Sequence, residues 1–284
     1  MSIQQIEPPP TPPALPPQAL APMDEPMSVM EHLRELRTRL VISLGSLIIG
    51  FMLATFLPIP FSGIDPTKVI VTVVPGTTTI TSEVIRLLIA PVSGNVQAIR
   101  PGEVLFTYFK IALLTGAGLA MPVIVYQIML FVLPALLPEE KKYLYIALPG
   151  VFGSFLIGVA FGYLVLVPTA VGFLMQFGAG IIDQNWALEE YLETISGLLF
   201  WMGVAFEMPL IMVILSKVGV VSVKRMTGFR KYMIVLAFVV GAFITPTPDP
   251  VNQLLVSVPL YMLYELGILL ARLFNTTSRR RKSA

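Results

Sequence analysis

Acidic side chains within apolar segments are the residues of this sequence best suited to membrane chemistry. Glu207 lies inside the apolar stretch 195–215, directly before Met208 and Pro209, and no opposite charge is near it in sequence. A carboxylate near the centre of a bilayer costs roughly 2.5–3.5 kcal/mol on insertion scales unless it faces a polar cavity or a partner. We therefore expect Glu207 to be functional and to line a wet groove.

Two further carboxylates accompany Glu207 in the second half of the chain. Asp249 stands in the run TPTPDP at residues 245–250, where a turn-forming aspartate is the plainer interpretation. Glu265 lies near the end of an apolar segment and could extend to the interface or pair with Arg272. As a relay, Glu207, Asp249 and Glu265 would suit a proton-coupled secondary transporter.

A second acidic position lies in the arm that precedes the first apolar segment. Residues 28–40 begin with the capping-box spacing of Ser28 and Glu31, and apolar residues recur at helical intervals. This pattern predicts an amphipathic helix that lies in the membrane interface and leads into the first span. Within it, Glu35 has the spacing of an i,i+4 ion pair with Arg39, which is its plainer interpretation.

A third acidic position, Glu139 and Glu140, follows Pro138. Proline and then acidic residues are typical of a helix N-terminus, and this again is the plainer interpretation. Two acidic patches on one otherwise basic face would also suit a ligand with adjacent guanidinium groups, because arginine binds carboxylates in a bidentate manner.

The elements that must position these residues are apolar helices. The chain is 55% hydrophobic and 13% charged, with a mean hydropathy of +0.81, against about 25% charged residues in soluble domains. It has no cysteine and one histidine, His32. We therefore expect neither a metal site nor another cofactor, and no Ser–His–Asp set within one chain. The composition indicates a membrane protein with several spans.

Six apolar segments are predicted to cross the bilayer. They are residues 40–57, 106–137, 144–167, 195–215, 233–244 and 251–271. The second contains Pro122 and Pro134, which should kink it. The fifth is short, and the pattern leaves open whether it spans or forms a re-entrant hairpin with the sixth. Basic residues concentrate on one side of these segments, so both termini are predicted to be cytoplasmic.

The remaining segments complete the predicted domain organisation. Residues 1–27 are rich in proline and predict a disordered cytoplasmic tail, residues 28–274 the membrane domain, and residues 275–284 a basic tail. The long outer connection 58–102 contains β-branched runs at 68–74 and 77–81 around Pro75-Gly76, which predict a hairpin over 68–81. A short amphipathic helix at 82–90, ended by Pro91, should follow.

Several short motifs occur in a fixed order along the chain. They are HLRELR at 32–37, Ala90-Pro91, Tyr126-Gln127, Phe131, Pro134-Ala135-Leu136, FEMP at 206–209, the stretch 241–246 before Asp249, and Pro259 with Tyr261, Glu265 and Gly267. This ordered set resembles the TatC family, the multispanning subunit of the twin-arginine protein translocase, and the resemblance covers roughly residues 28–274. Lys141-Lys142 stands where an arginine pair is common in that family, and the 68–81 hairpin looks like an insertion.

The resemblance implies an all-α polytopic protein of six transmembrane helices in a cupped bundle, with both termini cytoplasmic. It implies that the chain is no enzyme but binds the twin-arginine signal peptides of folded proteins. The positions that match the family's signal-binding region are Glu35, Glu140, Glu139, Arg37, Phe131 and Pro134. Those matching its intramembrane or concave face are Glu207, Gln253 and Asp249, and Pro91 matches a structural proline.

The implied partners follow from the same resemblance. They are the single-span subunits TatA and TatB, the lipid bilayer and further copies in an oligomeric complex driven by the proton-motive force, without nucleic acid. The resemblance implies a plasma membrane, with a thylakoid membrane as the second choice. The proton-coupled transporter stays the alternative, although no inverted repeat supports it.

Overall fold

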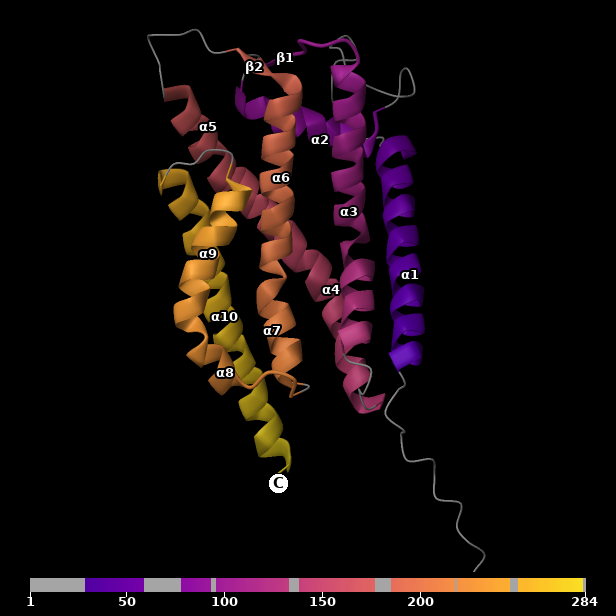
Figure 1. Ribbon diagram of the computed structural model, residues 1–284, viewed down its shortest axis with the longest axis vertical. Helices are drawn as coiled ribbons and strands as arrows, with labels where there is room; N and C mark the ends of the chain where they lie inside the picture. Colours follow the sequence, from indigo (N-terminus) through magenta and orange to yellow (C-terminus); the bar gives the residue numbers. More distant parts are fainter. Residues whose placement is uncertain are drawn as a thin grey trace, which may run out of the picture.

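The computed structural model describes residues 29–58, 78–92, 96–132, 138–176, 185–217, 219–245 and 250–282. These form an all-helical bundle (Figure 1). The long helices are α1 (Val29–Phe56), α3 (Glu103–Val132), α4 (Pro138–Phe161), α6 (Leu188–Phe206), α9 (Arg230–Ile244) and α10 (Pro250–Lys282). Shorter helices are α2 (Ile80–Ile89), α5 (Val167–Gln176), α7 (Met208–Lys217) and α8 (Val223–Gly228), with a 3-10 turn η1 (Ala90–Val92) and a π-turn η2 (Gly162–Leu166).

Five helical runs within the described residues are long and apolar enough to cross a membrane. They are Leu33–Phe56, Glu103–Phe131, Pro149–Gln176, Leu188–Lys217 and Pro250–Phe274. The fifth predicted segment corresponds to α9, whose 15 residues make a helix of about 22 Å. That is shorter than the hydrocarbon core of about 30 Å, so α9 differs from the other five.

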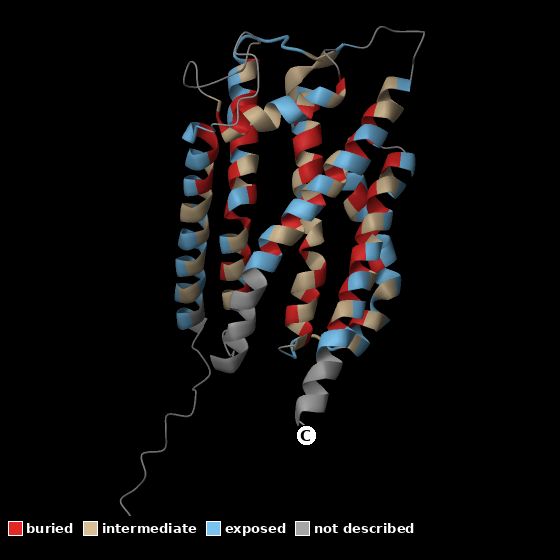
Figure 2. Cartoon of the chain, turned by 180° about the vertical axis from the view of Figure 1, so that it is seen from behind, coloured by how far each residue is buried: buried red, intermediate tan, exposed pale blue. Residues whose placement is uncertain are grey.

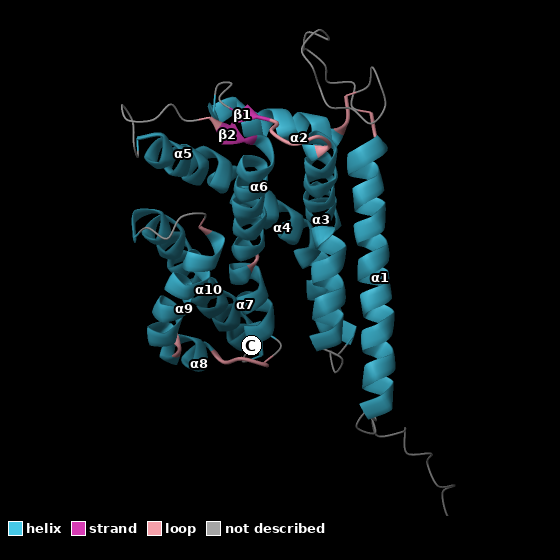
Figure 3. Ribbon diagram, turned by 45° about the horizontal axis from the view of Figure 1, so that its top comes forward, coloured by secondary structure: helices cyan, strands magenta, loops and turns pink. Residues whose placement is uncertain are grey.

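The two ends of the bundle carry different elements (Figures 1 and 3). One end holds α2, the start of α3 and α6, and the two-residue strands β1 (Val96–Gln97) and β2 (Trp186–Ala187), which pair in parallel. We call it the α2 end. The opposite end, the α8 end, holds α8, the first turns of α1 and α4, and the last turns of α7 and α10. The chain therefore brings the beginnings of α1 and α4 to one end.

The arm 28–40 is helical from Val29 and leads into the first span, as predicted. It continues without interruption as one helix of 28 residues, so it does not form a separate interfacial helix. Ser28, the predicted cap, lies outside the described residues. Helix α1 packs on α3 through small residues. A Cβ on Gly50 would lie 2.3 Å from the Gly116 carbonyl oxygen of α3. Glycine at both positions lets the two backbones touch.

The second and third spans differ in length from their predicted segments. Helix α3 continues through Pro122 and ends at Val132, and Pro134 lies outside the described residues. The third span is longer than the predicted 144–167, because η2 joins α4 to α5 and the helical run reaches Gln176. The wide π-turn lets the helix continue past Gly162, where a Cβ would meet Leu199 of α6 at 2.7 Å.

The fourth span is interrupted at Glu207, between α6 and α7. Pro209 has no amide hydrogen, so the Ala205 carbonyl lacks its regular helical donor there. The Glu207 amide donates to the carbonyl of Val204, at 3.1 Å. Helices α3, α4 and α10 continue through Pro122, Pro149 and Pro259, so a proline alone does not cause the break.

Helix α2 is short and lies across the α2 end of the bundle. It begins at Ile80, where Thr79 and Ser82 form a capping box: the Thr79 amide donates to Ser82 Oγ at 2.8 Å. The predicted helix at 82–90 is confirmed with an earlier start. The predicted strand 77–81 is wrong at its end, because Thr79 caps the helix and Ile80 and Thr81 lie within it. The rest of the predicted hairpin lies outside the described residues.

The distribution of buried and exposed residues is the one expected of a helical bundle embedded in a membrane. Exposed residues run along most of α1 (Figure 2), and many of them are large and apolar, including Leu40, Leu44 and Ile48. The main core lies between α2, α4, α6 and the η2–α5 run and includes Leu88, Leu166, Leu192 and Met202. An apolar outer surface is stable only against lipid, because water would favour its burial.

Candidate functional site

Glu35 lies in the part of α1 near the α8 end and is held by its own helix. Arg39 Nη2 lies 3.1 Å from Glu35 Oε1, which confirms the predicted i,i+4 pair. The Arg39 guanidinium also donates through Nη1 to Gln127 Oε1 of α3, at 3.1 Å. In the sequence Gln127 stood out only as part of a family motif, whereas in the structure it accepts from the same guanidinium that pairs with Glu35.

The second oxygen of Glu35 has no equivalent contact. The side chain is only 20% exposed, and Oε2 is buried without a hydrogen-bond partner among the described residues. A buried carboxylate oxygen without a donor is costly, because it has lost its water. This arrangement leaves a fixed acceptor that a cationic group could satisfy.

The other residues predicted for signal binding lie at the same end or outside the described ranges. Glu139 and Glu140 belong to the first turn of α4, and their side chains are not described. Phe131 is half-buried in the last turn of α3, and Arg37 is exposed on α1. Pro134 lies outside the described residues. The helices thus bring Glu35 and the start of α4 to one end of the bundle.

Glu207 is buried, which contradicts the expectation of a wet groove in the single chain. The residue is 1% exposed, and neither carboxylate oxygen has a hydrogen-bond partner among the described residues. The backbone of Phe155 in α4 is close to it. Near this contact α4 and α6 lie very close, since a Cβ on Gly203 would meet the Phe155 ring at 2.5 Å. Glu207 is therefore a buried carboxyl group at the break of a span, and its oxygens have no hydrogen-bond partner within the described part of the chain.

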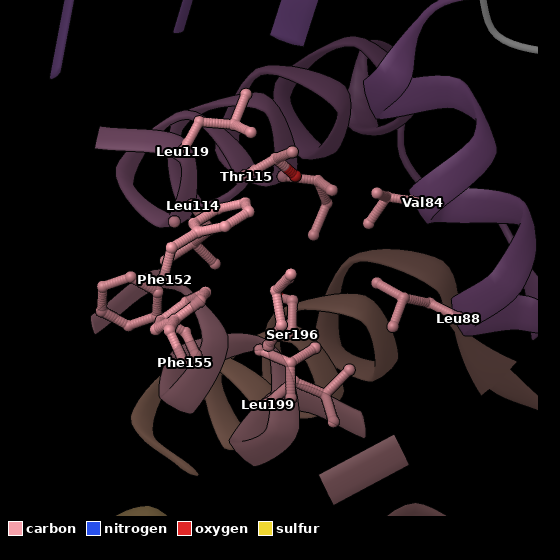
Figure 4. A pocket seen from close by; sticks show the side chains of 14 residues that line it. Val84, Leu88, Leu114, Thr115, Leu119, Phe152, Phe155, Ser196 and Leu199 are labelled. Carbon is pink, nitrogen blue, oxygen red and sulfur yellow. The ribbon is translucent and has the colours of Figure 1, made fainter. Parts of the chain in front are cut away.

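An apolar cavity of about 170 Å³ opens between α2, α3, α4 and α6 (Figure 4). Val84 and Leu88 of α2 form one side of it. Phe152 and Phe155 of α4 and Leu199 of α6 form others. Thr115 and Ser196 are the polar residues among those that line it. A site of this character suits an apolar ligand rather than a reaction.

The three carboxylates of the alternative relay do not form one in the described structure. Glu265 pairs with Arg230 of α9, with Oε2 2.6 Å from Nη2, and Tyr261 donates to its Oε1 at 3.0 Å. The sequence had offered extension to the interface or a pairing with Arg272, whereas the described partners of Glu265 are Arg230 and Tyr261. Asp249 lies outside the described residues. Gln253, near the start of α10, donates to the Phe238 carbonyl of α9 at 3.0 Å.

A carboxylate clasp at the α2 end, in which Glu103 accepts from three backbone amides, was not predicted from the sequence. Glu103 is 4% exposed and accepts from the amides of Ile99, Arg100 and Glu189, at 2.7, 2.8 and 3.0 Å. The last contact caps α6 from α3. The turn Pro101-Gly102 before Glu103, with Gly102 at φ +81°, could have indicated a helix start. It could not have indicated the distant partner Glu189.

A neighbouring ion cluster ties the same two helices at their surface. Lys110 Nζ of α3 lies 2.7 Å from Glu189 Oε1 and 2.9 Å from Glu193 Oε2 of α6. Glu189 therefore contributes its backbone to the Glu103 clasp and its side chain to this cluster. No three metal-ligating side chains converge anywhere in the described ranges.

Comparison with known proteins decides what kind of molecule carries this arrangement. Residues 31–259 match the family model described as "Sec-independent protein translocase protein (TatC)". The Deinococcus radiodurans Sec-independent protein translocase protein TatC is 37% identical over 268 residues, which cover 93% of this chain and 90% of that protein. The chain belongs to the TatC family.

Other TatC proteins and a solved structure agree with this membership. The Synechocystis TatC protein is 34% identical, over 89% of this chain and 91% of that one. The chloroplastic TATC of Arabidopsis thaliana is 35% identical, over 89% of this chain and 68% of that protein. A crystal structure of the twin arginine translocase receptor TatC superposes with a TM-score of 0.68 and 34% identity, over 86% of this chain and 99% of that one.

The function implied by the motifs is therefore confirmed at this level. The chain is the TatC receptor subunit of the twin-arginine translocase, a multi-pass membrane protein. It is a component of transport and not an enzyme. The translocase is thus favoured over the proton-coupled transporter.

Proposed function

We propose that this TatC chain binds the twin-arginine signal peptides of folded proteins at its α8 end, with Glu35 as the principal carboxylate. The observation that carries the proposal is the buried Oε2 of Glu35, which lacks a donor among the described residues while Arg39 holds Oε1 at 3.1 Å. A guanidinium is planar and donates in pairs, so it would satisfy this oxygen with a charge-assisted hydrogen bond.

Glu140, supported by Glu139, would receive the second arginine. Both belong to the first turn of α4, which begins at the same end of the bundle as α1. Two carboxylates on two helices would suit two adjacent guanidiniums better than one carboxylate could, because like-charged ligand groups need separate counter-charges. Arg37, Phe131 and Pro134 would shape the surroundings of this contact.

The apolar part of the signal would continue toward Glu207 on the concave side of the bundle. Lining residues of the cavity between α2, α3, α4 and α6 are almost all apolar, which suits such a segment. Insertion of a peptide would change the packing around Glu207, whose oxygens are buried without a hydrogen-bond partner among the residues that the structure describes, which is unfavourable. Asp249 and Gln253, at the turn between α9 and α10, would provide polar contacts toward the other end.

The same proposal includes the sixth span and the partners. Helix α9, although about 22 Å long, would cross a locally thinned bilayer, giving six spans with both termini cytoplasmic. A folded cargo is far wider than a cavity of about 170 Å³. The single-span subunits TatA and TatB would therefore assemble around several copies of this chain, and the proton-motive force would drive export across the plasma membrane.

Charge reversal tests the docking site. Glu35→Lys and Glu140→Lys should each reduce photocrosslinking of a twin-arginine signal peptide to purified membranes at least tenfold, and a signal whose arginine pair is replaced by lysines should show the same loss. Glu190→Lys, on the exposed face of α6 at the α2 end, is the matched control and should crosslink normally. Unchanged crosslinking in both Glu35→Lys and Glu140→Lys would remove these residues from the docking site.

A further inference from the structure

Helix α2 is tied to other helices at both of its ends. At its beginning, Thr79 Oγ1 and Tyr108 Oη of α3 lie 2.8 Å apart, and Thr81 Oγ1 donates to the Ala54 carbonyl of α1 at 2.8 Å. At its other end, the tyrosine hydroxyls of two different spans donate to consecutive α2 carbonyls. The helix thus links α1, α3, the η2 turn after α4, and α6.

The tyrosine contacts are specific in their geometry. Tyr163, in η2, donates to the Leu87 carbonyl at 3.1 Å, and Tyr191, in α6, donates to the Leu88 carbonyl at 2.7 Å. Tyr191 is 5% exposed. A phenol buried this deeply requires a hydrogen-bond partner, and the carbonyl supplies one without any charge.

Pro91 explains why the Leu87 carbonyl is available. In an α-helix the carbonyl of residue 87 accepts from the amide of residue 91, and proline has no amide hydrogen. The last regular bond of α2 runs from the Ala90 amide to the Arg86 carbonyl. The next acceptor in the helix, Leu87, is therefore left for a side chain, and the Tyr163 hydroxyl reaches it.

We infer that Pro91 acts by keeping the Leu87 carbonyl open for Tyr163, so that Tyr163 and Tyr191 are positioning residues that fix α2 over the cavity. These two contacts therefore fix the distance between α2, which covers one side of the cavity, and the helices on the other sides. Leu88 and Val84 of α2 line the cavity of about 170 Å³ (Figure 4), so the hydroxyl contacts hold these side chains against α3, α4 and α6. This inference concerns the α2 end and does not depend on docking of arginine residues at Glu35.

A measurement of the distance between α2 and α5 tests the inference. The chain has no cysteine, so spin labels can be attached at Arg86→Cys on α2 and Thr169→Cys on α5, both exposed. Double electron–electron resonance in lipid nanodiscs should give a narrow distribution in the parent chain. Tyr163→Phe, which removes one oxygen atom, should raise the population of longer distances about fivefold, the equivalent of one hydrogen bond of ~1 kcal/mol.

Pro91→Ala supplies the decisive combination. The new amide should compete with the Tyr163 hydroxyl for the Leu87 carbonyl, so Pro91→Ala should broaden the distribution, and adding Tyr163→Phe should broaden it no further. Tyr191→Phe should broaden the distribution further both with and without Pro91→Ala, because Tyr191 donates to another carbonyl, that of Leu88. Tyr232→Phe, which alters an exposed tyrosine of α9 near the α8 end, is the control and should change nothing.

The outcomes that would overturn the inference are equally concrete. Additive effects of Pro91→Ala and Tyr163→Phe would show that the proline does not act through this carbonyl. A parent-like distance distribution in both Tyr163→Phe and Tyr191→Phe would show that the two hydroxyls do not fix the position of α2. Since Tyr163→Phe and Tyr191→Phe remove only oxygen atoms, the second result stands even if Pro91→Ala fails to fold. Neither result would affect the crosslinking test of Glu35.

Discussion

Helix α2 and the ion pairs of the α8 end are held by different kinds of contact. Helix α2 is held by buried, uncharged contacts, as in the pair Thr79–Tyr108, whose members are 1% and 0% exposed; the charged contacts of that end, made by Glu103 and Lys110, join α3 to α6 instead. At the α8 end the ion pairs Arg39–Glu35 and Arg230–Glu265 are partly exposed, and they stand beside a buried neutral bond from Tyr264 to the Met226 carbonyl. The comparison is therefore between the neutral contacts of α2 and these two ion pairs.

The difference follows from what each contact costs to break. A buried neutral hydrogen bond cannot be replaced by water, so its loss leaves an unsatisfied group. A half-exposed ion pair is weak in high dielectric and is screened by salt. The contacts of α2 are therefore expected to be insensitive to salt, whereas the two ion pairs are expected to weaken as salt is added.

The largest expected effect comes from separating α1 from α3. Gly50→Leu should destabilise the protein by about 3 kcal/mol or more, because the added side chain meets the Gly116 backbone and α1 must move away from α3. Thermal unfolding in detergent measures it. Gly45→Leu is the matched control, since a Cβ there has nothing within 4 Å. Equal stability of the two variants would contradict the close helix crossing.

The clasp at the α2 end should come second. Glu103→Ala leaves three backbone amides without their acceptor and should cost about 2–3 kcal/mol, with increased hydrogen exchange at Ile99, Arg100 and Glu189. Glu190→Ala, next to the clasp but exposed, should cost less than about 0.5 kcal/mol. A similar loss in both variants would mean that the clasp contributes nothing specific.

A smaller effect distinguishes the kind of contact at the α2 end. Tyr108→Phe removes the hydroxyl that meets Thr79 and donates to the Thr55 carbonyl, and should cost about 1–1.5 kcal/mol. Because no charge is involved, this cost should be the same from about 0.01 M to about 1 M salt, over which the Debye length falls from about 30 Å to about 3 Å. A cost that disappears at high salt would contradict a neutral contact.

The smallest effect is expected at the α8 end. Arg230→Met leaves Glu265 with only its Tyr261 contact among the bonds described here and should cost about 0.5–1 kcal/mol in low salt. The pair is 42% and 32% exposed, so this cost should largely vanish at about 1 M salt. Persistence of the full cost in high salt would mean that this ion pair and the contacts of α2 do not differ in kind.

Much of the fold could be predicted from local sequence because a membrane imposes a simple rule. Apolar runs located the five candidate spans that the described residues contain. The pair Glu35–Arg39 was predictable from helical spacing. The failed predictions were of another kind: Ile80 and Thr81 have β-forming side chains but lie in α2, because the capping box at Thr79 and contacts to α1 and α3 override propensity.

The sequence by itself determined the class of molecule, the approximate positions of five candidate spans and, through its ordered motifs, its family. Only the tertiary structure decided that Glu265 pairs with Arg230, that Glu103 caps α6, that Glu207 is buried and that two tyrosines hold α2. The physical reason is range. Hydrophobicity and helical periodicity act within one segment, whereas a hydrogen bond between distant residues depends on how whole helices pack, which no single segment encodes.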